Sequence, residues 1–293
     1  MFNSVTKKLM RAKRQSMRMA GVMVEYQCGR FVIQLPADHD LPVYQKNHQQ
    51  YDRFLPVLVK RIQAPGTVID VGANVGDTLA FMIDANSQMA YVCVEPDAEF
   101  FDLLQKNIER IRAVCGDTKV EAINSLAGKS VENVGLVGSA GTKHAVVGAG
   151  NQASVTIDEM LRDRNLPTVR LLKSDVDGFD FDVLNSAEGL LQAERPILFF
   201  ECQYLLEFQR DEYLVTIGKL HSLGYQSWCV FDNFGALILQ ATDIAVLAQL
   251  IDYVSRQNFG KSTRTVHYFD ILAWAPDDDA VVSAAISDYQ AKF

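Results

Sequence analysis

Short apolar runs alternate along the chain with longer segments in which apolar residues recur every three or four positions. The short runs have the length of buried strands, and the periodic segments have the pattern of amphipathic helices. We expect strands at 68–71, 91–95, 119–124, 169–174, 196–201, 225–231, 236–239 and 268–274. We expect helices at about 51–62, 77–83, 97–111, 156–164, 181–191, 211–223, 242–256 and 278–291. This alternation predicts the α/β class: a doubly wound sheet, mostly parallel with an antiparallel end, and with helices on both faces.

The first 64 residues form an extension that precedes the expected core. It comprises a basic helical segment at 1–20, a hairpin at 22–35, a polar loop at 36–48 and the helix at 51–62. We expect residues 65–293 to form the main domain, with a glycine-rich insertion at about 128–155 that contributes a flap. Short strands within this insertion are expected at 133–137 and 145–147. The extension is predicted to act as a lid over the ligand-binding edge of the sheet.

Charge is distributed unevenly along the chain. The formal net charge is −8, but residues 1–24 contain six basic residues and no acid, so the rest of the chain carries −8 less +6, or −14. Such an acidic body would repel a phosphate backbone, which argues against a nucleic-acid partner. In the basic segment, Phe2, Val5 and Leu9 have helical spacing. This predicts either a helix on an anionic membrane surface, which liposome binding lost on deletion of residues 1–20 would test, or a terminal helix that is frayed or docked on the protein itself.

The five cysteines are scattered and include no C-x-x-C pair, which indicates reduced core residues in a cytoplasmic protein. No apolar run reaches the length of a membrane span, and the basic N-terminus lacks the apolar segment of a signal peptide. We therefore expect a cytoplasmic protein, held peripherally at the inner membrane face under the first interpretation of residues 1–20. An oligomer stays open, because the sequence does not fix the oligomeric state.

A glycine turn follows the first core strand and opens the next helix. It runs from Asp70 through Gly72, Asn74 and Gly76 to Thr78. Glycine lets the backbone turn sharply and lets a ligand approach the main chain, while the start of the helix offers free N–H groups. The turn lacks the third glycine of the G-x-G-x-x-G dinucleotide motif, and its acid would repel a pyrophosphate. It suits a ligand with cationic groups, and S-adenosylmethionine carries both an ammonium and a sulfonium.

The ends of the next two strands supply residues for the rest of such a ligand. Glu95 ends the second strand and precedes Pro96, and an acid at this position can accept both ribose hydroxyls of a nucleoside. Ser125 and Leu126 follow the third strand, where we expect the adenine. Two alternatives remain: a partner protein that binds S-adenosylmethionine without catalysis, and a nicotinamide-dependent oxidoreductase. The missing glycine and Asp70 argue against the second alternative.

These motifs, with others further along the chain, resemble the FkbM family of S-adenosylmethionine-dependent methyltransferases. The matching segments are 68–76, 94–97 with Leu104 and Asn107, 156–159, 172–178 and 197–201. The resemblance implies a class I methyltransferase (Rossmann-like) fold and O-methylation, most often of sugar hydroxyls in polysaccharide biosynthesis or of secondary metabolites. It also implies cofactor contacts by Asp70, Gly72, Asn74, Gly76 and Glu95. The chain departs from the family pattern at Asp177 and Asp180, where the family usually has glutamate.

Acids at the ends of the fourth and fifth strands are candidates for the chemistry of methyl transfer. They are Asp175, Asp177 and Glu201, and Lys173 shares a strand face with Asp175. An alcohol is a poor nucleophile while protonated, so the site needs a base or a metal that lowers the hydroxyl pKa. Either Asp175 is the general base, oriented by Lys173 or Glu201, or Asp175 and Glu201 bind Mg²⁺ or a similar divalent cation. In a third interpretation, Lys173 pairs with a carboxylate and the group is structural.

The five histidines show no metal-ligand spacing; they are His39, His48, His144, His221 and His267. His221 is predicted to be structural because it lies on an expected helix. His267, before the last strand, is a candidate for contact with the acceptor, as are His39 and His48 of the lid loop.

Overall fold

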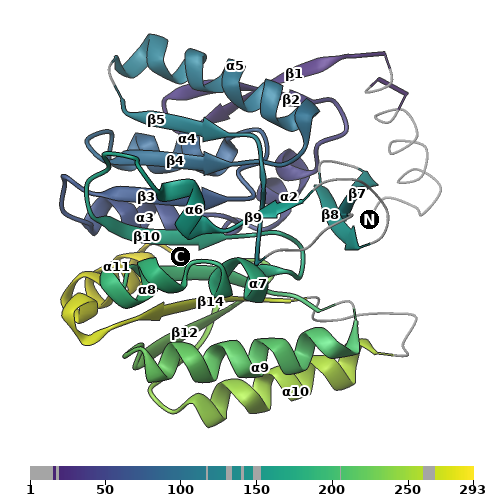
Figure 1. Cartoon of the computed structure of the whole chain (residues 1–293). Coiled ribbons are helices and arrows are strands. Elements are labelled where there is room, and N and C mark those ends of the chain that lie inside the picture. The colour runs from purple at the N-terminus through teal and green to yellow at the C-terminus, as the bar shows by residue number, and fades with distance from the viewer. Residues whose placement is uncertain are drawn as a thin grey trace.

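A central sheet with helices on both faces organises the described part of the molecule (Figure 1). The computed structural model describes residues 16–17, 20–116, 118–129, 134–139, 142–147, 153–204, 206–259 and 268–293. The order of the eight strands described for this sheet is β13-β12-β14-β11-β10-β3-β4-β5. Their bounds are Thr67–Val71 for β3, Ala90–Val94 for β4, Val120–Ile123 for β5, Val169–Ser174 for β10, Ile197–Cys202 for β11, Ser227–Asp232 for β12, Leu237–Ala241 for β13 and Phe269–Trp274 for β14.

The strands from β5 to β11 are parallel, whereas β14 is antiparallel to both of its neighbours and β13 is antiparallel to β12. In chain order, the five parallel strands lie as 3-2-1-4-5, and the winding direction reverses between β3 and β10. Ligands of such sheets bind outside the carboxyl ends of the strands at this reversal. The predicted doubly wound sheet with an antiparallel end is therefore confirmed.

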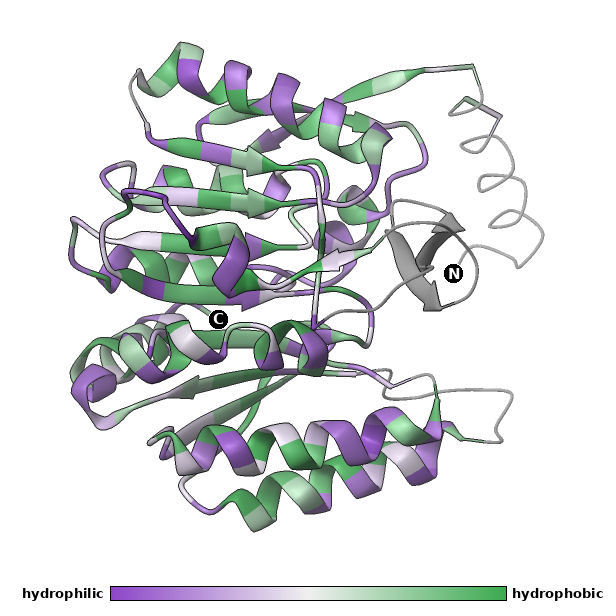
Figure 2. Ribbon diagram, in the orientation of Figure 1, coloured by the Kyte–Doolittle hydropathy of each residue, from purple (hydrophilic) through white to green (hydrophobic). Residues whose placement is uncertain are grey.

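Two layers of helices cover the sheet. One face carries α3 (Phe54–Arg61), α4 (Asp77–Ala85), α5 (Ala98–Cys115) and α11 (Asp279–Lys292). The other face carries α6 (Ile157–Leu161), α7 (Asp180–Asn185), α8 (Glu188–Ala193), α9 (Glu207–Ser222) and α10 (Ile244–Asn258). The strands are largely hydrophobic, whereas hydrophobic and hydrophilic positions alternate along the helices (Figure 2). This is the amphipathic pattern expected of helices that pack on a buried sheet.

The single helix expected at 181–191 is wrong, because the structure has α7 and α8 there. The Asp158 carboxylate accepts hydrogen bonds from the N–H groups of Gly189 at 2.7 Å and Leu190 at 3.0 Å. These bonds satisfy backbone donors at the start of α8, so a second helix can begin where the first one ends.

The polar loop expected at 36–48 is also wrong in part, because it contains helix α2 (Leu41–Asn47). This helix buries Leu41 and Gln45. The Gln45 side chain accepts hydrogen bonds from Tyr26 at 2.8 Å and from Arg53 at 2.7 Å. Contacts with distant residues therefore stabilise a helix that the local sequence does not predict.

The hairpin of the extension, β1 (Met23–Cys28) and β2 (Phe31–Pro36), packs against α5. The link between them is Asn107 of α5, whose side chain is fully buried. Its Oδ1 accepts a hydrogen bond from the Gln34 N–H at 2.8 Å, and its Nδ2 donates to the carbonyl oxygens of Gln34 at 2.9 Å and Val75 at 2.8 Å. One amide therefore joins the hairpin to the glycine turn.

The expected insertion contains an antiparallel hairpin of β7 (Val134–Ser139) and β8 (Thr142–Val147). At its two ends, β6 (Leu126–Ala127) pairs with β9 (Ser154–Val155). His267, the rest of the predicted flap and most of the basic segment at 1–20 lie outside the described residues. Within the described ranges, no helix has the length and apolar character needed to cross a membrane.

Candidate active site

The glycine turn lies at the carboxyl end of β3, beside the reversal of the sheet. Gly72 has a φ of +73°, and a Cβ atom there would stand 2.0 Å from the carbonyl oxygen of Asp175. The N–H groups of Gly72 and Ala73 both donate to the carbonyl oxygen of Val94, at 2.9 and 3.1 Å. The turn is thus pressed between the main chains that follow β10 and end β4, so its first position requires glycine.

Glu95 follows β4 directly and lies beside this turn. Its Oε2 accepts a hydrogen bond from the Asn74 N–H at 2.8 Å, and its Oε1 accepts one from the Asp97 N–H at 2.9 Å. Burial raises the pKa of Glu95 to about 7, although these two hydrogen bonds oppose the shift. Each carboxylate oxygen can accept about two hydrogen bonds, so each retains a place for a ribose hydroxyl. The acceptors at Glu95 therefore fit a nucleoside.

The other residues predicted for the cofactor gather at the same edge. Pro96, Ser125 and Leu126 are half-buried and follow the adjacent strands β4 and β5. The Asn124 side chain donates to the carbonyl oxygen of Glu95 at 2.8 Å and holds the two strand exits together. The structure thus leaves these residues accessible next to Glu95, as an adenosine site requires.

Lys173 of β10 lies beneath the glycine turn and is almost fully buried. Its Nζ is 2.9 Å from Asp70 Oδ1 and 3.7 Å from Asp175 Oδ2, and it donates to the carbonyl oxygen of Gly72 at 3.1 Å. Burial alone would lower the pKa of Lys173, but the charges of Asp70 and Asp175 raise it overall. Burial raises the pKa of Asp70, and Lys173 opposes this shift. Asp70 has no exposed surface, so its charge faces Lys173 rather than a ligand.

A recess opens beside the turn, at the carboxyl ends of β3, β10 and β11. It is lined by the acids Asp52, Asp175, Glu201 and Asp270, by Thr78, Lys173 and Arg53, and by the aromatic residues Tyr51, Phe54, Phe199, Phe231 and Tyr268. Its cavity of about 40 Å³ has room for only a few water molecules. Three predicted catalytic residues, Asp175, Lys173 and Glu201, therefore meet in one recess, which the extension helps to enclose.

A shared amide connects Glu201 to the fourth predicted catalytic residue, Asp177. Gln203 Nε2 donates to Glu201 Oε2 at 3.1 Å and to Asp177 Oδ1 at 3.3 Å. Burial, and then the charges of Asp175 and Asp177, raise the pKa of Glu201 well above its usual range. Asp177 itself does not line the recess; it is connected to Glu201 by the hydrogen bonds of Gln203.

The predicted divalent-cation site does not fit this geometry. Among the described residues, no group of three or more His, Cys, Asp or Glu side chains is placed to hold a metal ion. The Asp175 side chain is 55% exposed and lies beside the Lys173 ammonium, while Glu201 accepts a hydrogen bond from Gln203. A neighbouring ammonium repels a divalent cation, so we assign no metal to this pair.

Two acids of the recess, Asp52 and Asp270, escape prediction from the sequence. Asp270 lies opposite Glu201 in the pairing of β11 with β14. Because β14 is antiparallel, its beginning lies at the ligand-binding edge. Burial, and then the charges of Asp175 and Asp52, raise the pKa of Asp270 well above its usual range. The available signal was an acid inside the apolar last strand, whereas nothing in the local sequence marks Asp52.

The three histidines whose side chains the structure describes lie outside the recess. The His48 ring stacks on Phe234 with 3.8 Å between the ring centroids. His39 is buried, and its Nδ1 accepts a hydrogen bond from the Leu41 N–H at 3.3 Å. His221 lies on α9. None of these three lines the recess, while His267 and the side chain of His144 lie outside what the structure describes.

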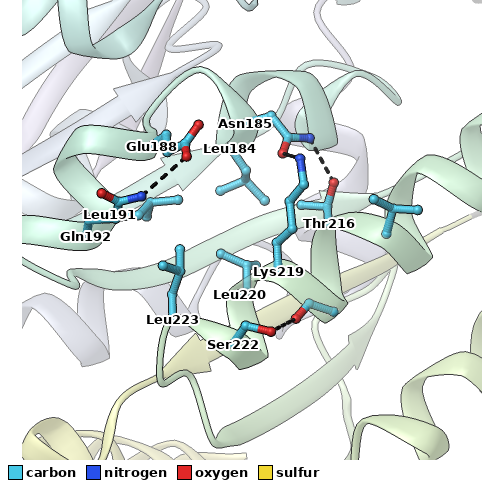
Figure 3. Close-up of a pocket in the computed structure, with 12 residues that line it drawn as sticks. Leu184, Asn185, Glu188, Leu191, Gln192, Thr216, Lys219, Leu220, Ser222 and Leu223 are labelled. Atoms are coloured by element: carbon cyan, nitrogen blue, oxygen red, sulfur yellow. Dashed lines mark hydrogen bonds between the residues drawn. The ribbon is translucent and has the colours of Figure 1, made fainter.

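A larger hollow of about 490 Å³ lies between α7, α8 and α9 (Figure 3). Its polar groups bond to one another: Lys219 donates to Asn185 at 2.9 Å, and Asn185 donates to Thr216 at 3.0 Å. None of the residues predicted for the site lines it. The recess beside the glycine turn is therefore the better candidate for the active site.

Two carboxyls in and around the recess, one buried and one half-buried, predict how stability depends on pH. Burial is the main reason that the pKa of Glu95 is raised to about 7 and that of Asp52 to about 8. The folded state then binds more protons than the unfolded state, whose carboxyl pKa is about 4. This contribution to stability is complete below the unfolded pKa and is lost as the pH rises through the folded values. Urea denaturation should show the free energy of unfolding falling between pH 5 and pH 8, and a rise over that range would contradict the assignment.

The chain matches the family described as "Methyltransferase FkbM domain" over residues 70–227, more than half of its length. No curated protein matches it. Similar solved structures include the methyltransferase FkbM from Methylobacillus flagellatus KT, with 15% identity, 80% of this chain and 59% of that chain covered and a TM-score of 0.43. A precorrin-6y C5,15-methyltransferase from Geobacter metallireducens GS-15 has 11% identity, covers 75% of this chain and 86% of its own, and has a TM-score of 0.40. The human methyltransferase 10 domain containing protein has 10% identity, covers 94% and 98%, and has a TM-score of 0.47.

Proposed function

This chain belongs to the FkbM methyltransferase family, and on that premise we propose that it is an S-adenosylmethionine-dependent O-methyltransferase whose acceptor is a hydroxyl of a glycan or of a secondary metabolite. The observation that carries the proposal is the glycine turn held against Glu95, beside a recess of acids. Glu95 and the half-buried residues after β5 would hold the adenosine. When bound, the cofactor supplies a methyl group on a positively charged sulfur.

The recess offers a base for the acceptor hydroxyl. The Asp175 side chain is 55% exposed and lies 3.7 Å from the Lys173 ammonium, so it can accept a proton within reach of solvent and of an acceptor. The raised pKa of Glu201 favours its protonated form, which can donate a hydrogen bond to the acceptor oxygen. Two carboxyl groups in different environments would thus take different roles, with Asp175 as the general base and Glu201 orienting the acceptor.

Calorimetric titration tests the first half of the proposal. We expect S-adenosylmethionine and S-adenosylhomocysteine both to bind at micromolar concentrations, with affinities unchanged by EDTA because the recess does not fit a metal. Failure of both ligands to bind, or binding of a nicotinamide cofactor instead, would overturn the proposal. Affinity that disappears in EDTA would restore the divalent-cation interpretation.

A screen of glycan and metabolite hydroxyls with radiolabelled cofactor tests the second half. On the acceptor found, we expect Asp175→Asn to slow methyl transfer by about 10²–10⁴-fold, because it removes the base, with little change in cofactor affinity. Asp288→Asn on α11 is the control, because Asp288 lies outside the recess. Full activity of Asp175→Asn, or transfer only to nitrogen or carbon acceptors, would contradict this assignment.

A further inference from the structure

The acids of the recess bear on how the site distinguishes its methyl donor from the spent cofactor. Building on the proposed function, we propose that Asp52 is a specificity-determining residue that favours S-adenosylmethionine over S-adenosylhomocysteine by charge. In methyl transfer, the carbon–sulfur bond breaks and a carbon–oxygen bond forms. The bonding electron pair stays on sulfur, and the hydroxyl proton passes to the base. The sulfur thereby changes from a cation to a neutral thioether, so a carboxylate near it would bind the substrate more tightly than the product.

Asp52 is held firmly at the recess although it belongs to the extension. Before it, the Tyr289 hydroxyl lies 3.2 Å from the carbonyl oxygen of Gln50 and 2.6 Å from that of Gly235. After it, the Arg53 guanidinium lies 4.3 Å from the centre of the Phe81 ring and donates to Gln45. Asp52 itself has a φ of +56°, a conformation that is costly for a residue other than glycine. Contacts on both sides therefore fix the stretch of backbone that carries this carboxylate.

The recess surrounding Asp52 is lined by more acids than bases. Four of its lining side chains are acids, and two, Lys173 and Arg53, are bases. Lys173 is shared between Asp70, at 2.9 Å, and Asp175, at 3.7 Å, while Arg53 bonds to Gln45. Burial, followed by the charges of Asp77 and Asp175, raises the pKa of Asp52. A cation that enters beside Asp52 would relieve this repulsion, whereas a neutral ligand would not.

The recess is also next to the predicted cofactor site. Thr78, in the first turn of α4, lines it, and Lys173 bonds to the carbonyl oxygen of Gly72 in the glycine turn. In-line transfer requires the methyl group to point at the acceptor, so a cofactor bound at the glycine turn would direct its sulfonium toward this recess. Among its four acids, Asp52 alone is contributed by the N-terminal extension, and Asp175 already has a role with the acceptor proton. Asp52 can therefore be replaced without altering a strand of the sheet.

The test compares the affinities of the two ligands by calorimetry in the full-length protein at pH 8.5. Burial, followed by the charges of Asp77 and Asp175, raises the pKa of Asp52 to about 8, so the carboxylate is mostly ionised under these conditions. We expect Asp52→Asn to lower the ratio of S-adenosylmethionine affinity to S-adenosylhomocysteine affinity by about tenfold. Asp52→Gly should do the same, and it keeps the fold because glycine adopts positive φ without strain.

Asp163→Asn is the matched control. Asp163 also has a positive φ, of +64°, but it lies exposed in the loop after α6. An unchanged ratio in both Asp52 variants, or an equal fall in the control, would overturn this inference while leaving the proposed function intact. Failure of the unaltered protein to bind either ligand would overturn the proposed function, and this inference with it.

Discussion

Replacing Lys173 with methionine should destabilise the folded protein by about 3–5 kcal/mol, because it leaves the Asp70 carboxylate buried without a counter-charge. Methionine keeps most of the volume of lysine and removes the ammonium, which lies 2.9 Å from Asp70. The loss should be smaller at pH 5 than at pH 8, since an unpaired buried carboxyl takes up a proton as the pH falls. Urea denaturation at the two pH values measures both effects.

Two further variants show whether the buried pair is the cause. The double variant Asp70→Asn/Lys173→Met should recover most of the lost stability, because no uncompensated charge remains. Arg110→Met, which removes an exposed ion pair with Glu25 at 3.3 Å, should cost no more than about 1 kcal/mol. A Lys173→Met protein as stable as the Arg110→Met protein would contradict the arrangement described for the pair.

Gly72→Ala is expected to cost more than about 3 kcal/mol and to abolish binding of S-adenosylmethionine. Positive φ alone costs a residue with a Cβ roughly 1–2 kcal/mol. At Gly72, the added methyl would also lie 2.0 Å from the carbonyl oxygen of Asp175, a main-chain atom that cannot move aside alone. The turn and the exit of β10 would have to separate, and this would displace Asp175 and the Lys173 contact to the turn. Denaturation and calorimetry together measure the two losses.

Gly21→Ala separates the collision from the cost of the backbone angle. Gly21 has a φ of +68°, close to that of Gly72, but a Cβ there would meet nothing within 4 Å. Its cost should be limited to roughly 1–2 kcal/mol, with cofactor binding unchanged. If the two alanine variants lose equal amounts of stability and of cofactor affinity, Gly72 does not lie as close to the carbonyl oxygen of Asp175 as described.

The sheet and the glycine turn could be predicted because their signals are local. A buried parallel strand appears in the sequence as a short apolar run, and the turn between Gly72 and Gly76 is formed by residues adjacent in the sequence. Glu95 could be placed by its distance from that turn along the chain. The same reasoning brought Lys173, Asp175 and Glu201 to one edge, since the carboxyl ends of neighbouring parallel strands meet there.

What escaped prediction depends on contacts between distant parts of the chain. The partner of Lys173 could have been any of several acids, and only the pairing of β3 with β10 selects Asp70. Asp52 enters the recess from an extension whose docking no sequence pattern specifies. Asp270 required knowing that β14 runs against its neighbours, which moves its first residues to the ligand-binding edge. Helix α2 forms where the sequence predicts a loop, because Gln45 bonds to Tyr26 of β1 and to Arg53, which precedes α3.

The amide of Asn107 has a consequence for where this protein can be cut. The family match begins at residue 70, yet β2 lies against α5, and Asn107 bonds to Gln34 and to Val75 of the glycine turn at once. A fragment beginning at residue 65 would lack Phe31, Ile33 and Leu35, which are all buried, and would expose the apolar surface that they cover to solvent. It would also remove a fixed neighbour of the turn. The limits of sequence similarity in this chain are thus not the limits of a unit that can be expressed, purified or grafted by itself.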